Sequence, residues 1–152
     1  DGADHALVEI GGRAVEAEVV VLDGGGRDAA LLTAPGLAAL AGAPVDAAGA
    51  KQHMAVRVLG HPEGGPLAER SGSVLGWLDD GPLALDGGRV LTLDLVVTEG
   101  MSGGPVVDGD GAVVGVAIGY ESNTRTGIAV PVDELTDLLD GVGAAPAQEQ
   151  AC

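Results

Sequence analysis

Apolar and polar residues alternate along most of this chain with a period of two. In residues 15–21, apolar side chains stand at every second position, and two of the three residues between them are glutamates. This alternation is typical of a β-strand with one face on a core and the other in solvent. Further short, Val-rich strands are expected at residues 7–10, 29–32, 54–59, 73–78, 90–97, 112–118 and 127–130.

Turn sequences separate these expected strands. Gly and Asp cluster at residues 23–26, 79–82, 86–88 and 108–111, and the chain holds 27 glycines and 8 prolines. Such residues favour tight turns and argue against a helical bundle. We interpret residues 108–111 as a hairpin turn and not a calcium loop, because Ala112 stands where a third ligand would be needed. Short strands at this spacing predict an all-β barrel or sandwich.

One amphipathic helix is expected, over residues 133–139. Pro131 precedes it, acidic residues stand in its first turn, and its three leucines fall on one face. Gly141 is expected to end the helix. Residues 142–152, rich in Ala, Gly, Gln and Pro, are expected to form a flexible tail.

The composition predicts a division of the chain at a linker. Residues 35–50 are mostly Ala, Gly and Pro with little periodicity. We therefore expect a first strand group with this linker at residues 1–50, and a second group with the helix at residues 51–141. The first group has two or three strands, too few to close a barrel.

Charge and composition exclude several functions. Lys and Arg number 7 against 23 Asp and Glu, for a net charge of −16, so nucleic-acid binding is not expected and an anionic membrane surface is disfavoured. No apolar run is long enough to cross a bilayer, and no signal peptide is visible. Cys152 is the only cysteine, which rules out an internal disulfide and a thiolate zinc site.

The sharpest chemical signal is the string GMSGGP at residues 100–105. A serine between glycines lies on a tight turn that a substrate backbone can approach, with amide hydrogens free to bind an oxyanion. The string also fits the nucleophile elbow of α/β-hydrolases, which needs a following helix and a later histidine. Here a strand and a Gly-rich turn follow, and His5, His53 and His61 all precede Ser102.

At this point the chain resembles a known family. The segments EGMSGGPVVDGDGAVVGVAIG and TGIAVPVDEL resemble the end of a trypsin-like serine peptidase of the bacterial HtrA-like branch. RDAALLTAPG resembles the family segment with the triad aspartate, and VRVLGHPEGG resembles the strand that opens the second barrel. The resemblance covers about residues 1–140. It implies an all-β fold of two antiparallel barrels, the first incomplete, with a short C-terminal helix.

The resemblance implies a set of site residues. Ser102 matches the nucleophile, Asp28 the carboxylate that orients the catalytic histidine, and the amides of Gly100 and Ser102 the oxyanion hole. The substrate pocket would be lined by Val96, Ile118 and Gly127. Since Val96 carries no carboxylate, we expect an apolar residue before the scissile bond. No cofactor and no metal ion is implied.

The catalytic histidine is where the chain departs from the family. The family's T-A-A-H pattern does not occur, and Met101 replaces the family's Asn or Asp. His5 stands in the right order, but DGAD followed by a strand resembles what comes just after that histidine. We therefore expect the histidine upstream of Asp1, and this chain to be a truncated and nearly inactive fragment. His61 replaces an aromatic residue at a turn and is expected to be structural, while His53 has no supporting context.

The implied function is peptide-bond hydrolysis through an acyl-enzyme in the intact parent protein. The partner would be a polypeptide substrate, and the location would be extracytoplasmic: secreted, periplasmic or in the cell envelope. The alternative is a non-catalytic pseudopeptidase or scaffold domain that binds peptide. That alternative predicts an eroded serine loop, whereas the loop here is intact.

Overall fold

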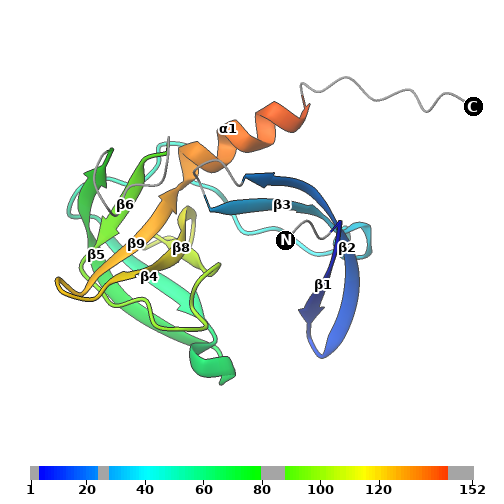
Figure 1. The fold of residues 1–152 in the computed structure, drawn as a ribbon, viewed down its shortest axis with the longest axis horizontal. Helices are drawn as coiled ribbons and strands as arrows, with labels where there is room; N and C mark the ends of the chain where they lie inside the picture. Colours follow the sequence, from blue (N-terminus) through cyan, green and yellow to red (C-terminus); the bar gives the residue numbers. More distant parts are fainter. Residues whose placement is uncertain (1–3, 24–27, 80–87, 144–152) are drawn as a thin grey trace, which may run out of the picture.

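The computed structural model describes residues 4–23, 28–79 and 88–143 of the chain. Its N-terminal part is an antiparallel sheet of three strands in the order β1-β2-β3 (Figure 1). These strands are β1 (His5–Ile10), β2 (Arg13–Asp23) and β3 (Ala29–Thr33). The alternation of β2 buries Ala17 on one face, while its glutamates stay exposed on the other.

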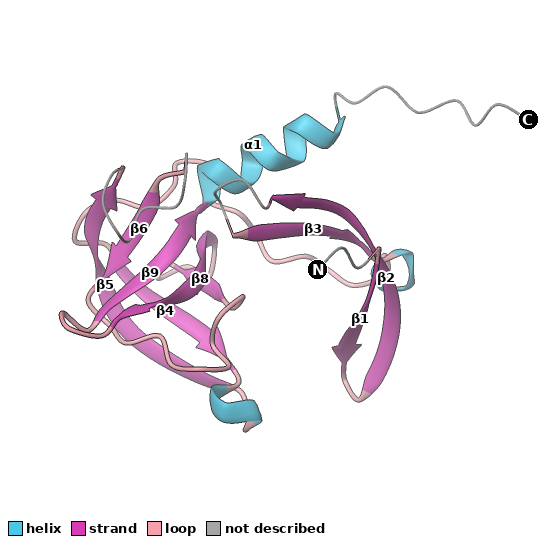
Figure 2. Cartoon of the chain, in the orientation of Figure 1, coloured by secondary structure: helices cyan, strands magenta, loops and turns pink. Residues whose placement is uncertain are grey.

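Six strands between residues 55 and 131 form a closed antiparallel barrel (Figure 2). The strands follow one another around the barrel in the order β4-β5-β6-β9-β8-β7. Their bounds are β4 (Ala55–Gly60), β5 (Ala68–Leu78), β6 (Val90–Leu93), β7 (Pro105–Val107), β8 (Val113–Glu121) and β9 (Thr126–Pro131). Because the barrel is closed, the second strand group has no free sheet edge where all six strands are paired.

The hydrophobic core lies inside the barrel. Alternate residues of β4 point inward, so Val56 and Val58 are buried. They pack with buried residues of the other five barrel strands, and with the loop residues Leu95, Val97 and Met101. Among the described residues 4–50, by contrast, only Ala17 is buried. The barrel therefore contains the apolar packing that stabilises this chain.

In the described part of the chain, two short helices, one α-helix and a linker accompany the two strand groups. The short 3-10 helices are η1 (Pro35–Leu37) and η2 (Pro62–Gly64). The α-helix α1 (Val132–Gly143) follows β9 and contacts β8, β9 and β3, so it lies against both strand groups (Figure 1). In the linker, Val45 forms a parallel bridge with Val113 of β8.

The all-β class, the incomplete first strand group and the C-terminal helix agree with the sequence. Three of the expected boundaries were wrong by four residues or more. β5 begins at Ala68 and not at residue 73, because its first half pairs with β4 through polar residues that show no apolar alternation. β6 ends at Leu93 and not at residue 97.

The third correction concerns the helix, which runs from Val132 to Gly143 and does not end at Gly141. Glycine lowers helix stability by only about 1 kcal/mol, so it does not have to stop a helix. Of the expected tail, residues 144–152 lie outside the described residues. The division into residues 1–50 and 51–141 stays a prediction.

Candidate active site

Two glycines shape the loop that carries Ser102. Gly100 has φ +83° and Gly103 has φ +81°, a left-handed conformation that side chains other than glycine's rarely adopt. Between them the chain reverses, so that Met101 is fully buried in the barrel core while Ser102 is exposed. The serine hydroxyl is thus presented at the surface by a loop whose neighbouring side chain is anchored inside.

Strand β8 supports this loop from one side. The amide of Gly103 donates to the carbonyl of Ala117 at 2.7 Å, and the amide of Ala117 donates to the carbonyl of Gly104 at 2.9 Å. The Ser102 hydroxyl donates to the carbonyl of Ile118, with Oγ and O separated by 3.1 Å. Ser102 and Ile118, two residues that the sequence assigned to one site, therefore lie in direct contact.

Two backbone amides of the loop keep their hydrogens available. Within the described part of the chain, the amides of Gly100 and Ser102 donate to no protein acceptor. Donors of this kind next to a serine hydroxyl can stabilise the negative oxygen of a tetrahedral intermediate. The buried hydroxyl of Thr98, at the base of the same loop, also lacks a partner among the described residues.

The residues expected to line the substrate pocket come from the segment after β6 and from strands β8 and β9. Val96 is half-buried in the segment after β6, and Ile118 is half-buried on β8. Gly127 of β9 is buried, and a Cβ there would lie 2.8 Å from the carbonyl oxygen of Leu95 and 3.3 Å from a methyl group of Val97. Gly127 therefore packs directly against the two neighbours of Val96.

Asp28 lies in the other strand group. It immediately precedes β3, its side chain is exposed, and its backbone has φ +48°. Figure 1 shows β3 beginning at the end of the sheet nearer the barrel, where α1 contacts it. The described interactions include no hydrogen bond or ion pair between Asp28 and Ser102 or a histidine. Its role in a triad stays a prediction.

The three histidines occupy different places. His5 is exposed on β1, as expected for a strand residue, and lines a cavity of about 490 Å³ with Ala6, Leu7 and Glu16. His53 is an exposed residue ahead of β4. The His61 ring donates from Nδ1 to the carbonyl of Gly65 at 2.9 Å, and its backbone amide donates to the carbonyl of Gly100 at 3.0 Å. No described hydrogen bond joins any of these rings to Ser102.

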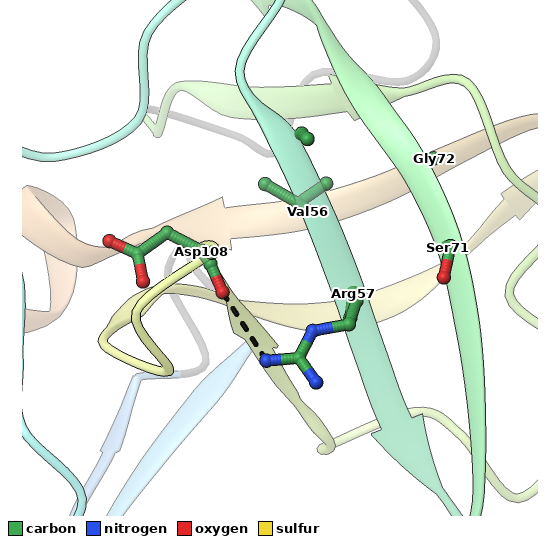
Figure 3. A pocket seen from close by; sticks show the side chains of 7 residues that line it. Val56, Arg57, Ser71, Gly72 and Asp108 are labelled. Atoms are coloured by element: carbon green, nitrogen blue, oxygen red, sulfur yellow. Dashed lines mark hydrogen bonds between the residues drawn. The ribbon is translucent and has the colours of Figure 1, made fainter.

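A second cavity, of about 240 Å³, opens between β4, β5 and the turn after β7 (Figure 3). The Arg57 guanidinium faces it and donates to Glu69 at 3.3 Å and to the carbonyl of Asp108 at 3.5 Å. Both ends of this guanidinium therefore have partners, and the cavity shares no lining residue with the serine loop. Asp108 forms the expected hairpin turn, because its carboxylate accepts the amides of Asp110 and Ala112.

Glu121, at the end of β8, is an acid whose pKa is clearly shifted by its surroundings. A hydrogen bond from the Thr124 hydroxyl, followed by those from the amides of Asn123 and Thr124, holds the pKa of Glu121 below its usual value. Elsewhere in the described residues, no group of three His, Cys, Asp or Glu could hold a metal ion. The described helices also include none long and apolar enough to cross a membrane.

Comparison with known proteins gives consistent matches. A family model described as a trypsin-like peptidase domain matches residues 1–116. The Rv3671c protease of M. tuberculosis is similar in its active form, with a TM-score of 0.80 and 29% identity over 95% of this chain and 66% of that one. Its inactive form has a TM-score of 0.77 and 30% identity over 94% of this chain and 74% of that one.

The HtrA-type protease AlgW, solved with a decapeptide, has a TM-score of 0.80 at 23% identity, over 93% of this chain and 45% of that one. At that identity the likeness concerns the fold. No curated protein sequence matches the chain. The chain thus spans about two thirds of the active-form Rv3671c chain and under half of the AlgW chain.

Proposed function

This chain belongs to the trypsin-like peptidase family, and from that premise we propose that it hydrolyses internal peptide bonds through an acyl-enzyme on Ser102. Its family and its structural neighbours, among them the Rv3671c protease, support a serine protease domain. One observation carries the finer proposal. The Ser102 hydroxyl is exposed on a loop whose Gly100 and Ser102 amides have no protein acceptor among the described residues.

The proposed reaction uses these groups in order. Ser102 Oγ attacks the substrate carbonyl carbon, and the carbonyl oxygen, now negative, accepts hydrogen bonds from the Gly100 and Ser102 amides. A histidine takes the hydroxyl proton and later gives it to the leaving amine, while Asp28 orients that ring and stabilises its charged form. Because the hydroxyl now donates to the Ile118 carbonyl, it must first rotate toward the histidine.

We propose that this histidine is not among the three in the sequence. His5 lies on β1 with no described contact to Ser102, and His53 lies ahead of β4 and outside the serine loop. The His61 ring is hydrogen-bonded to the Gly65 carbonyl. The base would then be contributed by a histidine ahead of Asp1, as the DGAD segment suggests. Without it a serine hydroxyl is a weak nucleophile, so the 152-residue chain would react slowly.

The substrate would be a polypeptide bound along β8. Residues 119–121 pair with β9 on one side, and on the other side they have no strand partner in the described part of the chain. An extended peptide can add to such a free edge through main-chain hydrogen bonds. Val96, Ile118 and Gly127 would then contact the residue before the scissile bond, with an apolar preference. The fold of this chain is that of AlgW, which was solved with a decapeptide.

We also propose an extracytoplasmic location, on the resemblance to HtrA-type proteases alone. An alkaline phosphatase fusion to the natural full-length protein tests this proposal, because that enzyme folds to its active form only where disulfides can form. Active fusions are expected. Inactive fusions that are stably expressed would place the protease in the cytoplasm.

Labelling with a fluorophosphonate probe tests the proposed activity. We compare the 152-residue chain with a longer natural chain that contains the upstream histidine, and expect fast labelling of the longer form only. Loss of one triad member leaves about 10³–10⁴-fold catalysis over water. Ser102→Ala should abolish labelling, and Asp28→Asn should slow it strongly. Rapid labelling of the short chain would show that a histidine within it, with His5 tested first, is the base.

A second candidate function is a non-catalytic peptide-binding domain. The observation that favours it is the lack of a described hydrogen bond between Ser102 and any of the three histidines. This function predicts that the longer chain stays inert toward the probe and still binds peptide. It also predicts equal peptide affinity for the wild type and Ser102→Ala.

A further inference from the structure

The proposed oxyanion hole needs the Gly100 amide hydrogen to point toward the substrate. This hydrogen belongs to the peptide group that joins Glu99 and Gly100. No described peptide bond is cis, and in a trans peptide the N–H and C=O bonds point in opposite directions. Whatever holds the Glu99 carbonyl therefore also sets the direction of the Gly100 amide hydrogen.

The Glu99 carbonyl is held by one residue. The backbone amide of Glu63, in the turn after β4, donates to it at 3.0 Å. The carbonyl thus points to the turn, and the Gly100 amide hydrogen points to the opposite side of the peptide group. The next peptide group is fixed as well, because the His61 amide donates to the Gly100 carbonyl and the Met101 amide to the Thr98 carbonyl, both at 3.0 Å.

The turn and the serine loop touch mainly through backbone atoms, with the Met101 Cβ also close to Gly60. A Cβ on Gly100 would lie 2.2 Å from the His61 carbonyl oxygen and 2.9 Å from the Glu63 nitrogen. A Cβ on Gly60, at the end of β4, would lie 2.7 Å from the Met101 Cα. No side chain fits between them. The hydrogen bonds from the Glu63 and His61 amides to the serine loop therefore depend directly on the shape of the turn.

Glu63 has an uncommon backbone conformation that gives the turn this shape. Its φ is +53° and its ψ is 27°, and Gly64 after it has φ +72°. Three hydrogen bonds close the turn: the Gly64 amide to the His61 carbonyl, the Gly65 amide to the Pro62 carbonyl, and His61 Nδ1 to the Gly65 carbonyl. A left-handed non-glycine residue persists when its surroundings determine it in this way.

We propose that Glu63 is a positioning residue of the protease: its backbone amide holds the Glu99–Gly100 peptide with the Gly100 hydrogen turned toward the substrate. This inference rests on the proposed function of the Gly100 amide. Glu63 acts through its backbone, so its carboxylate takes no part. Without this bond the peptide can rotate, because Gly100 has no Cβ to restrict it, and one oxyanion donor is lost.

Two substitutions at position 63 separate the backbone from the side chain. Glu63→Gly removes the carboxylate but keeps the amide and suits a positive φ, so labelling of Ser102 should proceed at the wild-type rate. Glu63→Val disfavours the left-handed conformation and should slow labelling about 10²-fold, the effect of losing one oxyanion donor. The longer, histidine-containing chain is used for both.

Arg125 offers a matched control. It is an exposed residue at the tip of the β8–β9 hairpin with φ +58°, so Arg125→Val imposes a similar backbone strain away from the serine loop. Arg125→Val should lower the melting temperature as Glu63→Val does, yet leave the labelling rate unchanged. Equal labelling by the two valine variants would overturn the proposal, as would slow labelling of Glu63→Gly.

A second measurement does not need the reaction. The scalar coupling across a hydrogen bond, between the Glu63 nitrogen and the Glu99 carbonyl carbon, is measured by NMR on the full chain. We expect this coupling in the wild type and in Glu63→Gly, and its loss in Glu63→Val. Its absence from the wild type overturns the proposal. If the coupling is present but no form of the chain reacts with the probe, the positioning contact stands and the proposed proteolytic function fails.

Discussion

Gly104, two residues after the serine, shows how little space the residues around Ser102 leave. A Cβ there would lie 2.0 Å from the Leu59 carbonyl oxygen and 2.9 Å from the Met101 carbonyl oxygen. Both are backbone atoms, so neither can turn aside as a flexible side chain does. We predict that Gly104→Ala lowers the free energy of unfolding by about 1–3 kcal/mol, the usual cost of overpacking a core. Urea unfolding followed by circular dichroism measures it.

Gly109 is the control for this prediction. It lies in the turn after β7, has an ordinary φ, and a Cβ added to it would meet nothing within 4 Å. Gly109→Ala should therefore leave the urea midpoint unchanged. A Gly104→Ala variant as stable as Gly109→Ala would mean that β4 and the serine loop separate easily.

At this scale the sequence pointed to Ser102, the proposed nucleophile, but not to the residues that support its loop. GMSGGP was recognisable because the two glycines that bend the loop lie within two residues of Ser102. Asp28 had no local signal and was named only by resemblance. Glu63 and Gly60 were not named, because their contacts join segments almost 40 residues apart. The one available signal was the string GHPEGG at residues 60–65, whose glycines and proline predict a tight turn.

Among the elements, the β8–β9 hairpin contains a titrating group that can be tested. The hydroxyl of Thr124 and the amides of Asn123 and Thr124 lower the pKa of Glu121 by binding its ionised form. We predict that Thr124→Val raises this pKa toward its usual value, because the hydroxyl is lost and the amides remain. An NMR titration of the Glu121 side chain measures the change.

The sign of the effect on stability follows from the lowered pKa. The folded state binds the Glu121 proton less tightly than the unfolded state does. The resulting stabilisation is complete above the unfolded pKa and is lost as the pH falls through the folded pKa. Thr136→Val is the matched control, since the Thr136 hydroxyl donates to the Val132 carbonyl and not to Glu121. A shift of the Glu121 pKa in this control would contradict the assignment.

Strand patterns were readable where one face of a strand meets a core and the other meets water. β2 and β4 alternate in this way and were predicted within two residues of their ends. The first half of β5 contains the consecutive polar residues Glu69, Arg70 and Ser71. It shows no apolar alternation, so its pairing with β4 could not be predicted from the sequence. Leu95 and Val97 looked like strand residues, yet they are buried in a loop that packs on Gly127. Burial, and not strand pairing, explains that pattern.

The whole molecule has an uneven distribution of apolar contacts. The described core cluster consists of barrel and serine-loop residues, and Ala17 alone is buried among the described residues 4–50. Local stability follows such burial. We therefore predict that backbone amides of β1–β3 exchange with solvent faster than those of β4–β9, in hydrogen exchange followed by NMR or mass spectrometry. Equal protection of both groups would mean that the sheet and barrel unfold as one unit.

The acidic character of the chain gives a further prediction at this scale. With a net charge of −16, the folded chain repels itself, and added salt screens that repulsion. The melting temperature should rise as sodium chloride is increased from about 0.01 M to 1 M, over which the Debye length falls from about 30 Å to 3 Å. An equal concentration of an uncharged osmolyte serves as the control, and a melting temperature that falls with salt would contradict this view.

The backbone contacts between the serine loop and the turn after β4 limit how the proposed catalytic loop can be engineered. Residues 98–105 are not expected to keep their conformation when moved alone, because Gly60, His61 and Glu63 contact their backbone. A transplant of the loop alone into another barrel would carry the proposed nucleophile without the turn that sets the shape of the loop. A designer must move the two segments together to keep the Glu99–Gly100 peptide in the orientation seen here.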